Sequence, residues 1–180
     1  MGVGGRVEFT VRPGVPMGHV TGVPYLCALG VAEALGARLR WPFAVVSATG
    51  EPVAGVRARA GYDDEGVFVA CEIAPACEIA PLGEEGLDAA ALERAARERL
   101  GAWAEDVSSG RAAAGPLAPV LGDYFDVLLG MGERVEVLRG GRVIGEGSLA
   151  GVDVWGRATV RLDDARELEI APEQAELRYV

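Results

Sequence analysis

Two copies of one short motif are the most obvious candidates for chemistry in the sequence. Residues 70–75 (Ala-Cys-Glu-Ile-Ala-Pro) are repeated at 76–81, so Cys71 and Cys77 stand six residues apart, each followed by a glutamate. Thiolates and the single histidine, His19, are ligands that zinc prefers, but structural zinc sites typically space paired cysteines by about two to four residues. A longer offset with intervening prolines does not suit that geometry. The motif therefore predicts a short duplication that lengthens a strand and a loop, and no metal site.

Acidic side chains are the second candidate. Asp123, Asp126 and Glu133 could form a carboxylate set, and a run from Glu84 to Asp88 precedes a segment with helical spacing. Carboxylates are favourable at helix N-termini, and charged runs usually lie on solvated faces. The sequence has no Gly-x-Ser-x-Gly, Cys–His or phosphate-loop pattern. We therefore predict solvated surface at both places, and find no support for nucleophilic or nucleotide-loop chemistry.

The charge of the chain restricts its partners. Among 180 residues the net charge is −10, all 17 basic residues are arginine, and lysine and asparagine are absent. A negative field repels a phosphate backbone, so we expect no nucleic-acid partner. No apolar run approaches the ~20 residues of a membrane span. The N-terminus has no apolar signal segment, which predicts a cytoplasmic protein with free thiols at Cys27, Cys71 and Cys77.

The hydrophobic pattern predicts an α+β arrangement for the first part of the chain. An apolar stretch over 18–35 ends at Gly36 and indicates a helix buried on most sides. A second helix is predicted from about 87 to 107, where Leu92, Ala96, Leu100 and Trp103 recur at helical spacing. Strands are predicted at 7–12, 38–42, 43–47, 53–60 and 67–73, and a short helix at 121–129.

The pattern of predicted elements changes after Gly130, from mixed helices and strands to short strands alone. Five short alternating segments, at 134–138, 142–149, 158–162, 167–170 and 176–179, are separated by turns rich in glycine and aspartate. Many short strands at close spacing are typical of a small closed barrel. We therefore predict two domains: an α+β layer domain with a mixed sheet and packed helices over 1–130, and a small SH3-like β-barrel over 131–180.

In its order of elements and in several short motifs, the chain resembles the biotin-protein ligases, which are relatives of the lipoate ligases. Segment 40–44 (Arg-Trp-Pro-Phe-Ala) stands where that family has Lys-Trp-Pro-Asn-Asp, and 52–56 (Pro-Val-Ala-Gly-Val) where it has Lys-Leu-Ala-Gly-Ile. Segment 67–74 lies over a strand that ends in Gly-Ile-Gly-Ile-Asn, and 132–153 is similar to the family's C-terminal SH3-like cap. The likeness covers nearly the whole chain.

The departures from the family pattern fall on its functional residues. The resemblance implies that the two lysines, the asparagine and the aspartate engage biotin, ATP phosphates and metal; here those positions hold Arg40, Phe43, Ala44 and Pro52, while Trp41, Pro42 and Gly55 are kept. At the strand end, Ala70, Glu72 and Ala74 replace both glycines and the asparagine. These ten positions are expected to be a vestigial site. The family's Gly-Arg-Gly-Arg-Arg-Gly-Arg loop is also absent, and Met1 falls roughly where the half that carries it would end.

Loss of one charge-stabilising donor typically costs about 10²–10³-fold in rate, so several losses predict no catalysis by this chain alone. We expect no catalytic residue, no bound metal and no cofactor, although the family uses biotin, ATP and Mg²⁺. One interpretation is a non-catalytic binding or subunit-type module with a protein partner or a second copy of itself. The alternative is a ligase component that needs a separately encoded N-terminal half. Biotin carboxyl carrier protein is a partner only by family analogy.

Two structural expectations follow from this resemblance. If the ligand site has been abandoned, Phe43 should fill it and be largely buried, since an empty polar pocket must hold water or collapse. The strand at 7–12 would begin the sheet, and its free backbone groups would need a partner or shielding.

Overall fold

A computed structural model describes residues 6–76 and 89–180, and its first part is built on one mixed sheet of six strands. The strand order is β1-β5-β4-β3-β2-β6, with antiparallel neighbours except for the parallel pair β2–β6. The strands are β1 (Val7–Val11), β2 (Arg38–Arg40), β3 (Ala44–Val46), β4 (Pro52–Asp63), β5 (Gly66–Pro75) and β6 (Leu128–Leu129). The expected α+β class is confirmed.

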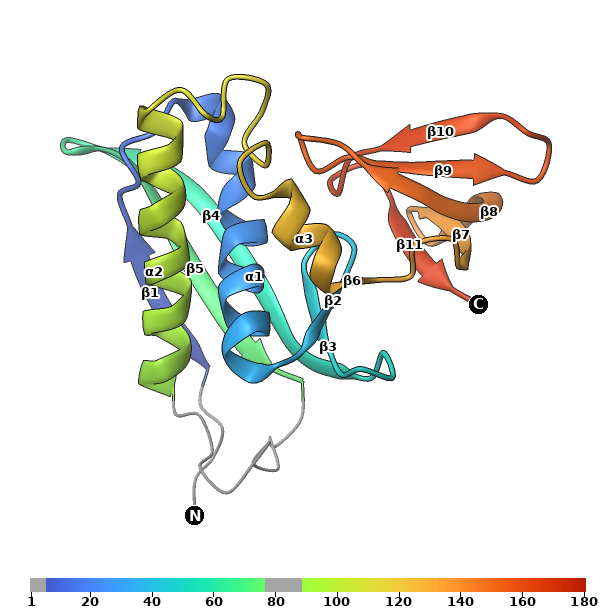
Figure 1. Ribbon diagram of the computed structural model, residues 1–180, viewed down its shortest axis with the longest axis horizontal. Helices are drawn as coiled ribbons and strands as arrows, with labels where there is room; N and C mark the ends of the chain where they lie inside the picture. The colour runs from blue at the N-terminus through green and yellow to red at the C-terminus, as the bar shows by residue number, and fades with distance from the viewer. Residues whose placement is uncertain (1–5, 77–88) are drawn as a thin grey trace, which may run out of the picture.

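Two long helices, α1 (Val23–Leu35) and α2 (Ala89–Ser108), cover one face of this sheet (Figure 1). They approach closely at Gly30, where an added Cβ would lie 2.7 Å from the carbonyl oxygen of Ala95. The core between helices and sheet contains residues such as Leu26, Leu29 and Ile73, all inaccessible to solvent. Burial of this apolar stripe from both layers packs the sheet against the helices, and none of the described helices covers its other face.

The structure differs from the sequence prediction at two places. The apolar stretch over 18–35 is divided into a 3₁₀ helix, η1 (Met17–Gly22), and α1. Pro24 lies in the first turn of α1, where its missing N–H costs no hydrogen bond, so the α-helix begins there. The predicted short helix ends early: α3 (Leu121–Val127) gives way to β6, which pairs with Leu39 and Arg40 of β2.

The second part of the chain is a strongly bent antiparallel sheet of five strands (Figure 1). Its order is β10-β9-β8-β7-β11, and register shifts in β7 and β8 accompany the bend. The strands are β7 (Arg134–Arg139), β8 (Arg142–Val152), β9 (Ala158–Leu162), β10 (Glu167–Ile170) and β11 (Glu176–Tyr179). This small β-domain begins after β6, close to Gly130, where the predicted pattern changes to short strands. None of the helices in the described ranges is long and apolar enough to cross a membrane.

Strand β1 is an edge of the six-stranded sheet. It pairs with β5 on one side, and within the described residues no strand pairs with its other side. Helix α2 supplies partial shielding, because Arg97 donates to the carbonyl oxygen of Thr10 at 3.2 Å and lies over the Phe9 ring at 4.8 Å. The expected need of this strand for shielding is thus met in part by its own chain.

Candidate functional site

The face of the sheet opposite the helices carries the polar side chains of three neighbouring strands. Alternation sends Phe9, Val56 and Ile73 toward the helices, so the residues next to them project from the open face. The register aligns these outward residues in two rows, Glu8–Glu72–Arg57 and Thr10–Ala70–Arg59. Two arginines of β4 therefore stand side by side, roughly 7 Å apart along the strand.

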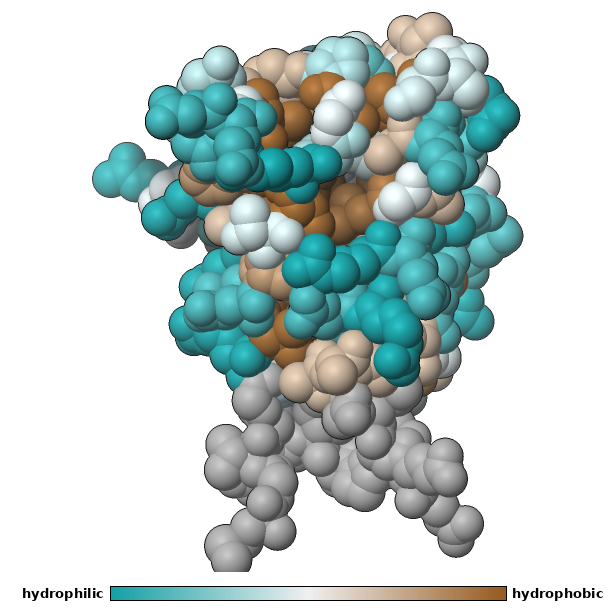
Figure 2. Space-filling view, turned by 90° about the vertical axis from the view of Figure 1, so that its left-hand side faces the viewer, coloured by the Kyte–Doolittle hydropathy of each residue, from teal (hydrophilic) through white to brown (hydrophobic). Residues whose placement is uncertain are grey.

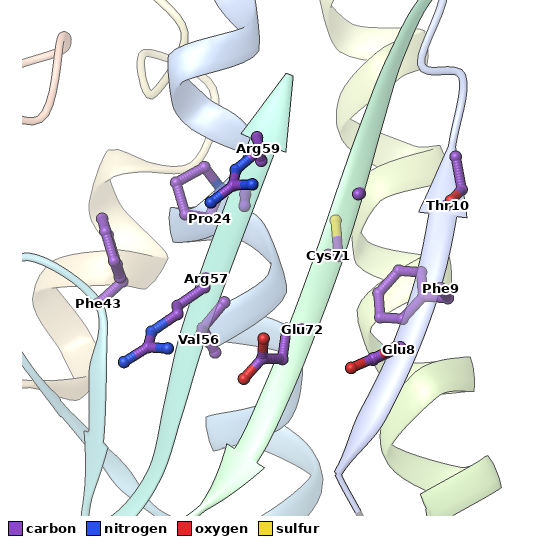
Figure 3. Close-up of a pocket in the computed structure, with 12 residues that line it drawn as sticks. Glu8, Phe9, Thr10, Pro24, Phe43, Val56, Arg57, Arg59, Cys71 and Glu72 are labelled. Atoms are coloured by element: carbon purple, nitrogen blue, oxygen red, sulfur yellow. The ribbon is translucent and has the colours of Figure 1, made fainter. Parts of the chain in front are cut away.

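This open face forms a broad cleft of about 660 Å³ (Figure 3). Arg57 and Arg59 project from the middle of the view, with Phe43 and Pro24 on one side and Glu72 and Glu8 on the other. The residues that line the cleft are Glu8, Phe9, Thr10, Pro24, Phe43, Val56, Arg57, Ala58, Arg59, Ala70, Cys71 and Glu72. Such a volume is in the range of small-molecule sites.

The charges in the cleft are only partly compensated. Arg6 lies 3.3 Å from Glu72 and 4.0 Å from Glu8, so its single positive charge offsets one of these two negative charges. In the described ranges no ion pair or hydrogen bond engages the guanidinium of Arg57 or of Arg59. Two free cations in a concave surface of a chain with net charge −10 are the main electrostatic feature of this face. The sequence contains a pattern that indicates this pair: Arg-Ala-Arg within a predicted strand places both arginines on the same face of the sheet.

Of the positions matched to the ligase motifs, three line this cleft: Phe43, Ala70 and Glu72. Gly55 and Ala74 are paired across β4 and β5 in the next row of the open face. Ala44 and Pro52 lie at the exposed starts of β3 and β4. Apart from Glu72, these positions present only apolar side chains or backbone.

The other three matched positions point away from the cleft, toward the β-domain and α3. The guanidinium carbon of Arg40 lies 4.3 Å from the centre of the Tyr179 ring. A guanidinium nitrogen of the same residue lies 3.8 Å from a carboxylate oxygen of Glu133. The indole N–H of Trp41 donates to the carbonyl oxygen of Gly156 at 2.8 Å, and the carbonyl of Pro42 accepts from the Tyr124 hydroxyl at 2.7 Å. Arg40 and Trp41 thus join the α+β domain to the β-domain.

Phe43 is half-buried, so the expectation that it fills an abandoned site is met only in part. Its ring packs edge-on against Tyr25, with centroids 5.2 Å apart. The exposed remainder of the ring lines the open-face cleft and also a second cleft. Phe43 therefore separates two hollows and closes neither of them.

The second cleft lies between the two domains and has a volume of about 670 Å³. The α+β domain supplies Thr21, Pro24, Tyr25 and Phe43, and the β-domain supplies Trp155, Arg157, Ala171, Pro172 and Glu173. Tyr25 donates to the Gly156 carbonyl at 2.7 Å; burial, with smaller effects from Glu173 and Asp153, raises the pKa of its phenol far above the usual range. Sequence reasoning did not find this cleft, because the segments that form it are far apart along the chain.

Of the candidate metal ligands, the structure describes Cys71, Glu72 and His19, and each of them has a different contact. Cys27 and Cys71 are buried with their sulfurs 3.8 Å apart, and the hydrogen bond between them, followed by burial, raises the pKa of the Cys27 thiol. His19 instead contacts the carbonyl oxygen of Ala112 at 3.0 Å. Among the residues that the structure describes, no group of three or more suitable side chains could hold a metal ion. Cys77, Glu78 and the acidic run 84–88 lie outside the described residues.

The carboxylates near the domain boundary are engaged separately. Asp123 pairs with Arg99, and Glu133 pairs with Arg40. Asp126 is exposed, and its backbone carbonyl accepts a hydrogen bond from Arg38. The three carboxylates therefore do not form one cluster, in agreement with the prediction that they lie on solvated surface.

Solved structures identify the fold. The biotin protein ligase of Aquifex aeolicus in complex with biotin and ATP superimposes with a TM-score of 0.69 at 19% identity, over 97% of this chain and 78% of that chain. Another crystal structure of the Aquifex ligase gives 0.66 at 19%, over 97% and 82%. The biotin acetyl coenzyme A carboxylase synthetase of Helicobacter pylori gives 0.51 at 13%, over 91% and 73%. No family model and no curated protein matches the sequence. The chain thus has a biotin-protein-ligase-like α+β fold with a C-terminal β-domain.

Proposed function

We propose that this biotin-protein-ligase-like protein does not ligate on its own and binds an anionic ligand on the open face of its sheet. The observation that carries the proposal is the pair of uncompensated guanidinium groups of Arg57 and Arg59 in a cleft of about 660 Å³. Guanidinium matches carboxylate and phosphate by paired, charge-assisted hydrogen bonds. The half-buried Phe43 ring and Pro24 on the same rim offer apolar surface for the body of such a ligand.

The non-catalytic part of the proposal is supported by what stands at the motif positions. Adenylation joins a carboxylate to a phosphate, which requires positioned cations and amide donors near the reacting oxygens. Of the matched positions, Phe43, Ala44 and Pro52 offer no such donor, and the guanidinium of Arg40 is already stacked on Tyr179 beside Glu133. On this proposal the open face can hold a ligand, but it lacks the side chains that would activate that ligand for adenylation.

Calorimetry with biotin, lipoate, ATP and AMP, beside neutral biotinamide, tests the proposal. We expect an anion to bind and its neutral amide to bind at least ~10-fold more weakly, since a hydrogen bond to a charged group contributes about 1.5–3 kcal/mol. The double variant Arg57→Ala/Arg59→Ala should lose that binding. No adenylate should form from biotin and ATP.

The matched control is Arg139→Ala/Arg142→Ala, which removes two exposed arginines of the β7–β8 hairpin that have no ion pair among the described residues. This variant should bind the anion as the unchanged protein does. Equal weakening by the two double variants would show a general charge effect and overturn the assignment to Arg57 and Arg59. Measurable adenylate formation by the isolated chain would overturn the non-catalytic part.

A second candidate function rests on the edge strand. A partner that carries the missing arginine–glycine loop could add a strand to β1 and complete a ligase. Beside β1 lies a hollow of about 290 Å³ between this strand and α2, lined in part by Val11, Leu100 and Ala104. Figure 2, which looks at this side, shows apolar residues at the bottom of hollows crossed by hydrophilic side chains.

Co-expression with a neighbouring gene product that carries such a loop tests this alternative. If it holds, the two proteins co-purify, biotin is transferred to a carrier protein, and the backbone amides of β1 exchange hydrogen more slowly in the complex. Strand β10, an edge of the other sheet, is the internal control and should exchange unchanged. Unchanged exchange at β1 in an active complex would place the partner elsewhere.

A further inference from the structure

The cleft between the two domains combines exposed aromatic surface with negative charge. Trp155 is 43% exposed and stands on the β-domain side, while the half-buried Phe43 stands on the side of the α+β domain. Tyr25 extends the aromatic lining and is itself held by its bond to Gly156. Aromatic ring faces carry negative electrostatic potential and attract cations.

The charged groups at this cleft leave an excess of carboxylate. Arg157 is the cation of the lining, but it is already paired with Asp153 at 2.6 Å and with Glu169 at 3.4 Å. Glu173 also lines the cleft, and no ion pair or hydrogen bond engages its carboxylate within the described ranges. Arg157 is thus neutralised by two carboxylates outside the lining, and the exposed Glu173 is the unpaired charge within the lining, so an anion is disfavoured here.

An uncharged occupant is also disfavoured. A ligand that fills the cleft displaces water from the side of the exposed Glu173 that faces it, and partial desolvation of a carboxylate costs free energy unless a partner replaces the water. A cation compensates this loss and gains from the rings at the same time. The volume of about 670 Å³ accommodates a small molecule.

We propose that the interdomain cleft is a binding site for a small organic cation of the alkylammonium class, held between Trp155 and Phe43 and neutralised by Glu173. The site is separate from the anion site on the open face, although Phe43 lines both clefts. It requires both domains in their observed arrangement, because neither supplies the two aromatic walls alone.

Titration with choline, followed by tryptophan fluorescence and calorimetry in low-salt buffer, tests the site. Trp155 is the reporter, since Trp41 and Trp103 are buried. We expect saturable binding with a dissociation constant of the order of 1 mM. The neutral isostere 3,3-dimethyl-1-butanol should bind at least ~10-fold more weakly, which matches the size of a partly desolvated cation–π contact.

Two variants locate the binding. Glu173→Gln and Trp155→Ala should each weaken choline binding about 10-fold. Glu176→Gln is the matched control, because it removes an exposed carboxylate of the same domain outside the lining of the cleft. Arg57→Ala/Arg59→Ala should leave choline binding unchanged, so failure of the anion proposal and failure of this one are distinguishable.

Equal binding of choline and its neutral isostere, or undiminished binding by Glu173→Gln, would overturn the proposal. Comparison of choline with the amide of Nα-acetyl-trimethyl-lysine assigns the source of the cation. Tighter binding of the amino-acid derivative points to a protein side chain, and tighter binding of choline points to a free small-molecule cation.

Discussion

Gly156→Ala should destabilise the protein by about 3 kcal/mol and loosen the two domains from each other. Gly156 lies in the β8–β9 turn with φ +82°, a conformation that costs a residue with a Cβ about 1 kcal/mol or more. An added Cβ would also lie 2.6 Å from the Tyr25 ring. The carbonyl of Gly156 accepts hydrogen bonds from both Tyr25 and Trp41, so a shift of this turn disturbs both interdomain bonds.

Urea unfolding monitored by fluorescence measures this effect, and Gly141→Ala is the matched control. Gly141 also has a positive φ, of +75°, but an added Cβ there would meet no atom within 4 Å. That variant should show the backbone strain alone, about 1 kcal/mol. Equal destabilisation by the two substitutions would mean that Gly156 makes no tight contact with Tyr25. Gly156→Ala should also weaken choline binding, because the cleft between the domains depends on their docking.

The local patterns of the sequence were sufficient to predict most elements of the fold. Strands predicted at 53–60 and 67–73 correspond to β4 and β5, and the turn residues between Asp63 and Gly66 join them as a hairpin. Helical spacing predicted α2, with Leu92 and Trp103 buried as that spacing requires. These features depend on residues close in sequence, where periodicity and turn chemistry are decisive.

Features that depend on contacts between distant segments were not predictable. Strand β6 has only two residues, and it is a strand because it pairs in parallel with β2. In that pairing Leu128 stands opposite Leu39, which lies 89 positions earlier in the sequence. The direction of Arg40 is set by Tyr179 and Glu133, which no local pattern connects to it. The interdomain cleft depends on Trp155 lining the same hollow as Phe43 and Tyr25, which are more than 100 positions away in the sequence. The candidate sites are therefore products of tertiary packing, whereas the motif positions could be matched from sequence alone.

The largest loss of stability is expected from Trp103→Ala. This side chain of α2 is 1% exposed, and its indole N–H donates to the carbonyl oxygen of Pro116 at 2.7 Å. It fills the space beside Gly22, where an added Cβ would lie 3.2 Å from the indole. Removing a buried aromatic side chain costs about 3–5 kcal/mol through lost burial and the cavity left behind.

Trp103→Phe separates the two contributions, because it keeps most of the volume and removes only the donor to Pro116. Leaving a buried carbonyl without its partner costs about 1–3 kcal/mol, so this variant should be the milder of the two. Trp155→Ala is the control for loss of an indole and should destabilise the protein much less than Trp103→Ala, since Trp155 is 43% exposed and Trp103 is 1% exposed. Because α2 packs on β1, loosening it should also disturb the row of Thr10, Ala70 and Arg59 on the open face. Folded Trp103→Ala, in buffer without urea, should therefore bind the anion more weakly than the unchanged protein. If Trp103→Ala unfolds at the same urea concentration as the unchanged protein, Trp103 does not have this stabilising role.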